Sequence, residues 1–287
     1  MKHFTSVILF LIVASIGPTV GAIIPGTYFD RIVLIIFENT GYTKALAQPY
    51  FKNLTQRSNG LLLSNFFAIT HPSQPNYITE IYGSTAGVTD DANHDIAGKN
   101  LVDLLEAKGI YWKAYMEDYP GNCYTGATAP SGQHLYARKH NPFISMNAIR
   151  NNSTRCAKIV PGTRLDTDIT NNHVPQFVYY TPNQNNDGHD TGVAFANNWL
   201  KNWLEPKLTK SAFTTNTLIF ITFDEDDRSE SNHIYGCLLG TPVRPPTNHT
   251  DSTKYNHYSY LATIEKNWNL GNLARNDVGA STITKYL

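Results

Sequence analysis

The segment Arg31–Phe37, RIVLIIF, is a continuous run of apolar and β-branched residues behind a single arginine. Such a run is typical of a strand that is buried on both faces, as the central strands of a parallel sheet are. The segment Thr217–Phe223, TLIFITF, has the same character. Together these two segments predict the centre of a parallel sheet.

The elements around these two segments alternate between strand and helix. We predict further strands at 65–70, 111–116, 176–180 and 233–239, and helices at 101–108, 192–204 and 259–268. This alternation predicts an α/β sandwich with a central, mostly parallel sheet flanked by helices. The Gly-, Pro-, Asn- and Ser-rich stretch 119–168 fits neither pattern, and we expect a long excursion there. Since no linker divides the chain, residues 23–287 are predicted to form a single domain.

Residues 1–22 have the pattern of a secretory signal peptide. A short basic start precedes an apolar stretch at 7–16, and small residues at 20–22 offer a cleavage site. The alternative is a membrane anchor, but the apolar stretch is shorter than the roughly 20 residues that a spanning helix needs. No other stretch is apolar enough to cross a bilayer. We therefore predict a secreted, extracellular protein without stable membrane association.

Secretion predicts two kinds of covalent modification. Four asparagines lie in Asn-X-Ser/Thr sequons and are candidate glycosylation sites: Asn53, Asn151, Asn152 and Asn248. An oxidising compartment favours one disulfide among three cysteines. Cys237 lies in an apolar run that predicts a buried strand, whereas Cys123 and Cys156 lie in polar surroundings. We therefore pair Cys123 with Cys156. No cysteine has a flanking motif for a catalytic role.

The charge balance argues against a nucleic-acid-binding protein. Lys plus Arg and Asp plus Glu number 23 each, so the formal net charge is zero with histidine neutral. A broad basic surface is therefore not expected.

Polar residues follow both of the strongest predicted strands, which is where ligands bind in open α/β sheets. Glu38 and Asn39 follow the first strand, and their oxygens suit a hard cation, although a turn or a helix N-cap is the alternative. Four acids, starting with Asp224 and Glu225, follow the second strand. They repel one another, and a bound cation would relieve that repulsion. The alternative for these acids is a solvated loop.

The segment 70–77, THPSQPNY, holds a serine between two prolines. The prolines restrict the turn and would present the Ser73 hydroxyl rigidly, while Asn76 would start a helix and offer its amide to an oxyanion. A serine hydroxyl needs a base or a metal to become an effective nucleophile. The alternative is a proline-rich turn with an N-capping serine.

Three histidines complete a possible site for an anionic substrate: His189, His233 and His257. Each of them alone is more typical of a surface or core histidine.

These strings resemble the phosphoesterase family that contains bacterial phospholipases C and secreted acid phosphatases, within the alkaline-phosphatase-like superfamily. The resemblance runs from Arg31 to about Leu270. It rests on IIFENT at 35–40, THPSQPNY at 70–77, NDGHD at 186–190, TFDEDD at 222–227, NHI at 232–234 and NHYSYLATIE at 256–265. It implies an alkaline-phosphatase-like sandwich.

The resemblance also implies roles for individual residues. Ser73 is implied as a nucleophile that is transiently phosphorylated, and Asn76 and His71 as substrate-binding groups. The implied metal ligands are Glu38, Asn39, Asp224 and Glu225. The implied phosphate-binding or proton-transferring histidines are His189, His233 and His257. The family often has Asp-Asp where this chain has Asp224-Glu225. The Glu-Asn and Asp-Glu pairs indicate one divalent metal ion rather than the two zinc ions of the wider superfamily.

The activity implied by the resemblance is that of a secreted acid phosphatase acting on small phosphate monoesters. A mildly acidic optimum is expected because a protonated histidine would supply the leaving-group proton. One alternative is a phospholipase C-like phosphodiesterase, and the end of the chain soon after the last motif favours monoesters over it. The other alternative is a non-catalytic, secreted binding glycoprotein, against which an intact Ser73 with its acidic partners argues.

Overall fold

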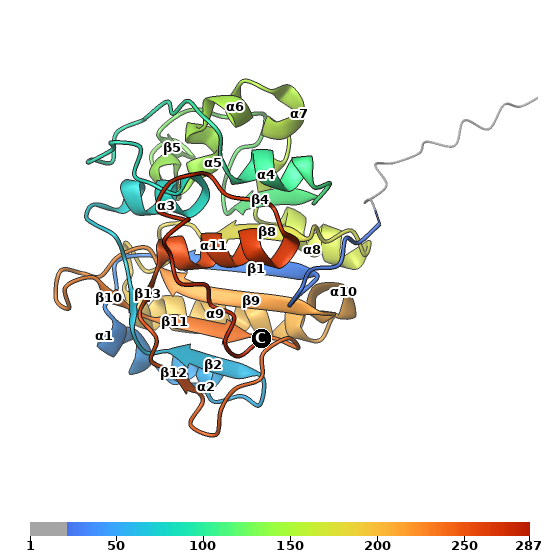
Figure 1. Cartoon of the computed structure of the whole chain (residues 1–287). Helices are drawn as coiled ribbons and strands as arrows, with labels where there is room; N and C mark the ends of the chain where they lie inside the picture. Colours follow the sequence, from blue (N-terminus) through green and yellow to red (C-terminus); the bar gives the residue numbers. More distant parts are fainter. Residues whose placement is uncertain (1–21) are drawn as a thin grey trace, which may run out of the picture.

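The two strands that are clearest in the sequence lie side by side at the centre of an eight-stranded sheet (Figure 1). The computed structural model describes residues 22–287, so residues 1–21 of the predicted signal peptide lie outside the described part. β1 (Arg31–Phe37) is parallel to β9 (Thr217–Phe223) on one side and to β8 (Phe177–Thr181) on the other. β4 (Trp112–Met116) and β7 (Ile159–Pro161) continue this parallel block beyond β8.

Three further strands complete the other side of the sheet, in the order β12-β2-β11-β9. β11 (Gly236–Leu239) runs antiparallel to both of its neighbours, β9 and β2 (Gly60–Leu63). β12 (Thr250–Asp251) is parallel to β2. The prediction of an α/β fold with a mostly parallel sheet is therefore confirmed.

Helices cover both faces of the sheet, which explains why every residue of β1 and β9 is buried. Successive side chains of a strand point to opposite faces. In β8, the ring of Tyr179 packs against Phe143 at 5.1 Å between centroids, whereas the next residue, Tyr180, packs against Trp203 at 4.4 Å. Phe143 belongs to α5 (Pro142–Ser145) and Trp203 to α9 (Val193–Leu208), so these helices lie on opposite faces.

The remaining helices join one or the other of these layers. α3 (Ser73–Tyr82) packs against α5 and α11 (His257–Trp268), and α2 (Pro49–Thr55) packs against α9. The other helical elements are α1 (Tyr42–Leu46), α4 (Leu101–Ala107), the 3-10 helix η1 (Arg138–His140), α6 (Asn147–Arg150), α7 (Ser153–Cys156), α8 (Arg164–Thr170) and α10 (Ser211–Thr214). The first turn of α3 lies beyond the ends of β1 and β9, where polar residues gather.

The predicted strand 233–239 divides into two strands that belong to different sheets. β10 (His233–Ile234) pairs with β3 (Phe66–Phe67), which also pairs with β13 (Tyr255–Asn256), whereas β11 joins the large sheet. The change of sheet occurs next to Gly236, where a Cβ atom would lie only 3.2 Å from Leu63 and 3.3 Å from Phe66. The predicted strand 65–70 is correspondingly reduced to β3.

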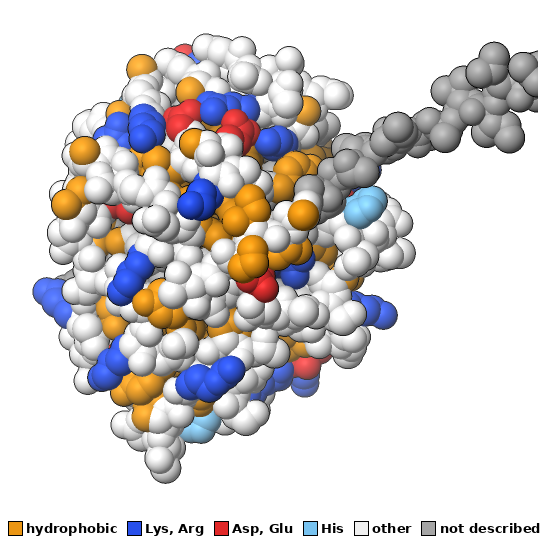
Figure 2. Space-filling model, turned by 45° about the vertical axis from the view of Figure 1, so that its right-hand side comes forward, with side chains coloured by type: hydrophobic (Ala, Val, Ile, Leu, Met, Phe, Trp, Pro, Cys, Tyr) orange, Lys and Arg blue, Asp and Glu red, His pale blue; other side chains and the backbone are white. Residues whose placement is uncertain are grey.

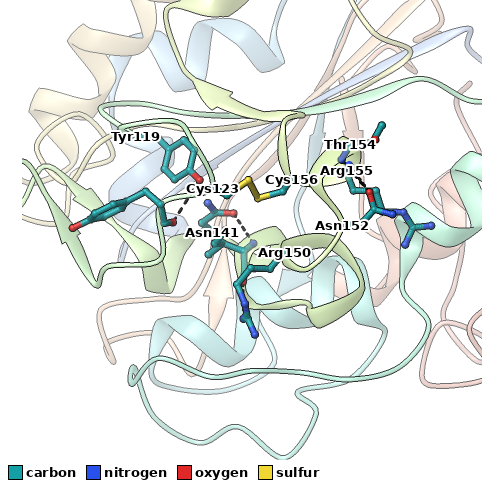
Figure 3. Close-up of a disulfide and its surroundings, with 10 residues drawn as sticks. Tyr119, Cys123, Asn141, Arg150, Asn152, Thr154, Arg155 and Cys156 are labelled. Atoms are coloured by element: carbon teal, nitrogen blue, oxygen red, sulfur yellow. Dashed lines mark hydrogen bonds between the residues drawn. A yellow bond between two sulfur atoms is a disulfide. The ribbon is translucent and has the colours of Figure 1, made fainter.

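The stretch 119–168, for which we predicted an excursion, consists of short elements held by one disulfide. It contains the hairpin of β5 (Thr128–Ala129) and β6 (Tyr136–Ala137), followed by η1, α5, α6 and α7. The disulfide joins Cys123 to Cys156 at the end of α7 (Figure 3). Cys237 is a buried free cysteine in β11. The predicted pairing and the predicted burial of Cys237 are confirmed.

The surface is mixed in character. On the face drawn in Figure 2, lysines and arginines stand singly or in small groups among polar and apolar side chains, with acidic groups between some of them. The four sequon asparagines are exposed, and Asn152 also caps α7 by accepting hydrogen bonds from Thr154 N and Arg155 N. Within residues 22–287, the helices are all too short or too polar to span a bilayer.

Candidate active site

The acids that follow β1 and β9 meet because the two strands are parallel and in register. Phe37 pairs with Phe223 at the ends of the strands, so Glu38 and Asp224 emerge next to each other. Asp224 N donates to the carbonyl oxygen of Phe37 at 2.9 Å, and Asn39 N donates to Asp224 Oδ1 at 3.1 Å. Both Glu38 and Asp224 are fully buried. The sequence order of each strand end therefore becomes a spatial cluster of oxygens.

Ser73 is the first residue of α3, and its hydroxyl lies within this cluster. Its Oγ is 3.0 Å from Glu38 Oε2 and 3.2 Å from Glu225 Oε1, and the side chain is buried. Pro72 precedes the helix in an extended conformation, which turns the chain sharply into α3. The structure thus brings together the serine of one predicted string and acids of two others.

Asn39 adds a further polar group to the cluster. Its backbone adopts the left-handed conformation, with φ of 46°, which returns the chain over the strand end. With its amide nitrogen toward the acids, Asn39 donates to Glu38 Oε2 at 3.3 Å and to Glu225 Oε1 at 3.0 Å. With its amide oxygen in that position, it contributes one more oxygen to the cluster.

Four carboxylates share this buried space, and each one is harder to ionise than usual. Burial raises the pKa of Glu38, Asp187 and Asp224 well above the ordinary range, and repulsion from neighbouring acids adds to the effect. Burial, followed by the charge of Glu38, raises the pKa of Glu225 to about 8. Among residues 22–287, no lysine or arginine forms an ion pair with any of the four. When the four carboxylates are ionised, their negative charge is therefore not balanced by a lysine or arginine in direct contact within the described chain.

The donor set fits a divalent cation in its chemistry. Glu38 Oε1, Asp187 Oδ2 and Asp224 Oδ2 are buried and have no hydrogen-bond partner within the described chain. Carboxylate, amide and hydroxyl oxygens are ligands that hard cations accept. In the part of the chain that the structure describes, no three His, Cys, Asp or Glu side chains already stand in a metal-binding arrangement. A complete set of ligands would therefore need Ser73 or Asn39 as well, or a small movement of the carboxylates.

The two predicted substrate-binding residues of the serine string both lie next to Glu225 Oε2. Asn76 Nδ2 is 3.5 Å from Glu225 Oε2 but also donates to Thr70 O at 2.8 Å, so Asn76 holds the turn before the helix. His71 Nδ1 lies 2.6 Å from Glu225 Oε2, and its Nε2 lies 3.1 Å from Asp226 Oδ1. Burial and the charge of Arg228 lower the pKa of His71.

The three predicted catalytic histidines occupy three different environments. His189 is at the rim, with its side chain 29% exposed and its Nε2 3.4 Å from Lys139 Nζ. His257 lies beneath the cluster, fully buried, with Nε2 2.6 Å from the carbonyl oxygen of Asp224. Burial lowers the pKa of His257 to about 4, so it is neutral over most of the acidic range. It faces the backbone of Asp224 and supports the strand end.

The structure does not bring His233 to the cluster. Its ring stacks on Tyr42 at 4.2 Å and on Phe67 at 5.0 Å between centroids, and its Nε2 lies 3.0 Å from Ser64 O. The reason is that His233 begins β10 of the small sheet, so its side chain packs there. The preceding residue, Asn232, accepts a hydrogen bond from Asp226 N through its side-chain oxygen.

Sequence reasoning missed His140 and the position of Asp187. His140 is buried between two of the acids. Its Nε2 lies 3.0 Å from Glu38 Oε1, although this contact does not have the geometry of a hydrogen bond. Its Nδ1 lies 3.5 Å from Asp187 Oδ2. Burial lowers the pKa of His140 well below the ordinary value. His140 lies in the irregular excursion, where only the basic triplet Arg138–His140 marks it. Asp187 lies in the string NDGHD at 186–190, in which only His189 was predicted to have a role.

Comparisons with known proteins identify relatives of this chain. A profile of the Phosphoesterase family matches residues 38–271. An acid phosphatase of Aspergillus fumigatus is 38% identical over 91% of this chain and 59% of its own length. A phosphatidylinositol-3-phosphatase of Mycobacterium tuberculosis is 31% identical over 84% of this chain and 78% of its own. The chain thus spans about three fifths of the length of the fungal relative.

A solved structure shares the fold at much lower sequence similarity. It is a protein of the alkaline phosphatase superfamily from Vibrio parahaemolyticus, with a TM-score of 0.59 and 10% identity, covering 91% of this chain and 74% of that one. The profile match extends from the first acid of the cluster to beyond α11, and it includes Ser73, Asp187, Asp224 and Glu225. The chain belongs to the phosphoesterase family.

Proposed function

We propose that the chain is a secreted acid phosphatase that hydrolyses phosphate monoesters through Ser73, with the help of one divalent cation. The observation that carries the proposal is the position of the Ser73 hydroxyl, 3.0 Å from Glu38 Oε2 and 3.2 Å from Glu225 Oε1 at the carboxyl ends of two strands. The similarity to acid phosphatases from fungi supports the substrate class.

Ser73 is the nucleophile in this proposal. Its Oγ forms a bond to phosphorus while the bond from phosphorus to the alcohol oxygen breaks. Glu225 Oε1, at 3.2 Å, would accept the hydroxyl proton when a bound cation keeps this carboxylate ionised at acidic pH. Water then hydrolyses the phosphoserine, which releases inorganic phosphate and restores the hydroxyl. The N-terminus of α3 directs backbone N–H groups toward the anionic phosphoryl group.

The residues that would hold the cation are Glu38, Asn39, Asp224 and Glu225, together with the Ser73 oxygen. A bound divalent cation would lower the pKa of the serine hydroxyl and offset charge on the phosphoryl oxygens. The unpartnered oxygens of Glu38 and Asp224 are the observation that supports this assignment.

A histidine would protonate the departing alcohol. His189 is the predicted histidine that remains accessible at the rim, whereas His257 is buried beneath Asp224. Asn76 and His71, which both lie next to Glu225 Oε2, would orient the phosphoryl oxygens after a small rearrangement. A rate profile that peaks above about pH 8 would argue against the acid activity.

The exposed sequons at Asn53, Asn151, Asn152 and Asn248 and the disulfide are consistent with a secreted glycoprotein formed by one domain over residues 23–287. Small phosphorylated molecules are the proposed substrates.

The test is the hydrolysis of nitrophenyl phosphate by the wild type and by Ser73→Ala, before and after treatment with a chelator. Ser73→Ala should lower kcat by at least about 1,000-fold. Chelation should abolish wild-type turnover, and divalent cations should restore it. Ser145→Ala, which removes another buried serine hydroxyl, is the matched control and should retain activity. Equal turnover in Ser73→Ala and the wild type would overturn the proposal.

A further inference from the structure

Lys139 is a cation at the rim of the acidic cluster. It lies in η1, next to His140, and its side chain is 19% exposed. Its Nζ is 3.1 Å from Asp91 Oδ2 and 3.4 Å from His189 Nε2. Burial lowers the pKa of Lys139, but the charges of Glu38, Asp91 and Asp224 raise it by more, so Lys139 stays positively charged. Lys139 thus places a positive charge at the rim of the cluster, whose four acids form no ion pair with a lysine or arginine among residues 22–287.

Asp91 connects Lys139 to the helix that carries the nucleophile. Asp91 Oδ2 accepts from Lys139 Nζ, and Asp91 Oδ1 accepts from the backbone N–H of Gln74 at 3.0 Å. Gln74 directly follows Ser73 in α3. One carboxylate therefore bridges a lysine ammonium group and an N–H group in the first turn of α3, one residue from the nucleophile.

Two donors that bind the two oxygens of one carboxylate are also suitably spaced for two oxygens of a phosphoryl group. Both ligands are anionic, and the separations between their oxygens are similar. The ammonium group and the helix N-terminus each favour a negative charge at this place. The side chain of Gln74 is 1% exposed, and neither its amide oxygen nor its nitrogen has a hydrogen-bond partner among residues 22–287. The first turn of α3 therefore also contains a buried side-chain amide whose donor and acceptor have no partner within the described chain.

Resting on the proposed function, we propose that Lys139 and the N–H group of Gln74 form the subsite that selects phosphate monoesters over diesters, and that Asp91 occupies this subsite in the absence of substrate. A monoester has one more unesterified oxygen than a diester and carries one more negative charge when fully ionised. Lys139 contacts this extra oxygen. Substrate binding displaces the Asp91 carboxylate toward solvent, where its side chain is already 33% exposed.

The first test compares Lys139→Gln with the wild type on nitrophenyl phosphate and on bis(nitrophenyl) phosphate. The variant should lose about 100-fold in kcat/KM on the monoester and less than about 3-fold on the diester. Lys139→Arg, which keeps the charge, should recover most of the monoester activity. Lys158→Gln is the matched control, because Lys158, the residue before β7, also pairs with a carboxylate, that of Glu106, at 2.8 Å from its Nζ. Equal losses on both substrates, or no loss, would overturn the inference.

The second test measures the binding of inorganic phosphate by calorimetry in the Ser73→Ala background, where no turnover is needed. Asp91→Asn should tighten phosphate binding by about 10-fold because a competing charge is removed, and Lys139→Gln should weaken it by about 10-fold or more. Weaker binding in Asp91→Asn would show that Asp91 only supports the helix. If turnover depends on Ser73 but Lys139→Gln changes neither selectivity nor phosphate binding, the inference fails and the proposed function stands. If neither ester is hydrolysed, the proposed function fails while phosphate binding still tests the subsite.

Discussion

The half-buried Glu106 at the amino end of the central sheet and the buried Glu225 at its carboxyl end have opposite surroundings. At the amino end, Glu106 accepts hydrogen bonds from Trp112 Nε1 at 2.9 Å, from Arg155 Nε at 2.8 Å and from Lys158 Nζ at 2.8 Å. At the carboxyl end, Glu225 lies among other acids and has only His71 as a basic contact within the described chain. Burial alone would raise the pKa of both glutamates. The donors around Glu106 outweigh it and lower the pKa of Glu106, whereas the pKa of Glu225 is raised to about 8.

This difference separates a carboxylate that stabilises the fold from carboxylates that are suited to chemistry. A buried acid without a partner costs free energy of folding, and mutual repulsion adds to this cost. Acids that keep such an arrangement are candidates for a functional site. The comparison predicts that equivalent substitutions at the two ends will have opposite effects on activity and on stability.

The largest effect is expected from Glu225→Gln at the carboxyl end. Hydrolysis of nitrophenyl phosphate should fall by about 1,000-fold, because an oxygen ligand and the acceptor next to Ser73 lose their charge. Above about pH 8, where Glu225 is ionised even without a cation, the Tm of the chelator-treated variant should be equal to or above that of the wild type, since one repelling charge is removed. A variant that is both inactive and much less stable would show that Glu225 is mainly structural.

A smaller and opposite effect is expected from Glu106→Gln at the amino end. Activity should stay within about 2-fold of the wild type. The free energy of unfolding should fall by about 1–2 kcal/mol, because two cationic donors lose their acceptor charge. Urea denaturation measures this change. If Glu106→Gln left the free energy of unfolding unchanged and reduced turnover, Glu106 would not be the stabilising carboxylate that this comparison takes it to be.

The smallest effect on activity is expected at a third acid, Glu265 of α11, which belongs to neither of these two groups of contacts. Burial and the nearby carboxylate of Asp277 raise the pKa of Glu265 to about 8, while its unfolded value is about 4.5. The native chain therefore holds this proton more tightly than the unfolded chain, and the associated stability is lost as pH rises from about 4.5 to about 8. Glu265→Gln keeps the neutral form, so its free energy of unfolding relative to the wild type should rise steadily over this pH range. A difference between the two proteins that does not change with pH would contradict the assignment.

The strand ends were predictable, because continuous apolar runs at β1 and β9 identify central strands and the acids follow them directly. Register then determines that Glu38 and Asp224 are neighbours. Lys139 and His140 were not predictable in this way. They lie in a stretch without hydrophobic periodicity, and only the packing of α3 against η1 and α5 brings them to the site. His233 shows the converse, because a recognisable string placed it near the site while a change of sheet carried its side chain elsewhere.

The third cysteine has a practical consequence for studying this protein. Cys237 lies in β11, between β9 and β2, and burial raises the pKa of its thiol to about 12. Because the other two cysteines are joined to each other, it is the one thiol among residues 22–287. An alkylating reagent would reach it only when β11 separates from its neighbours, so the labelling rate reports the opening of the central sheet. The chain thus contains an intrinsic kinetic probe of its own unfolding.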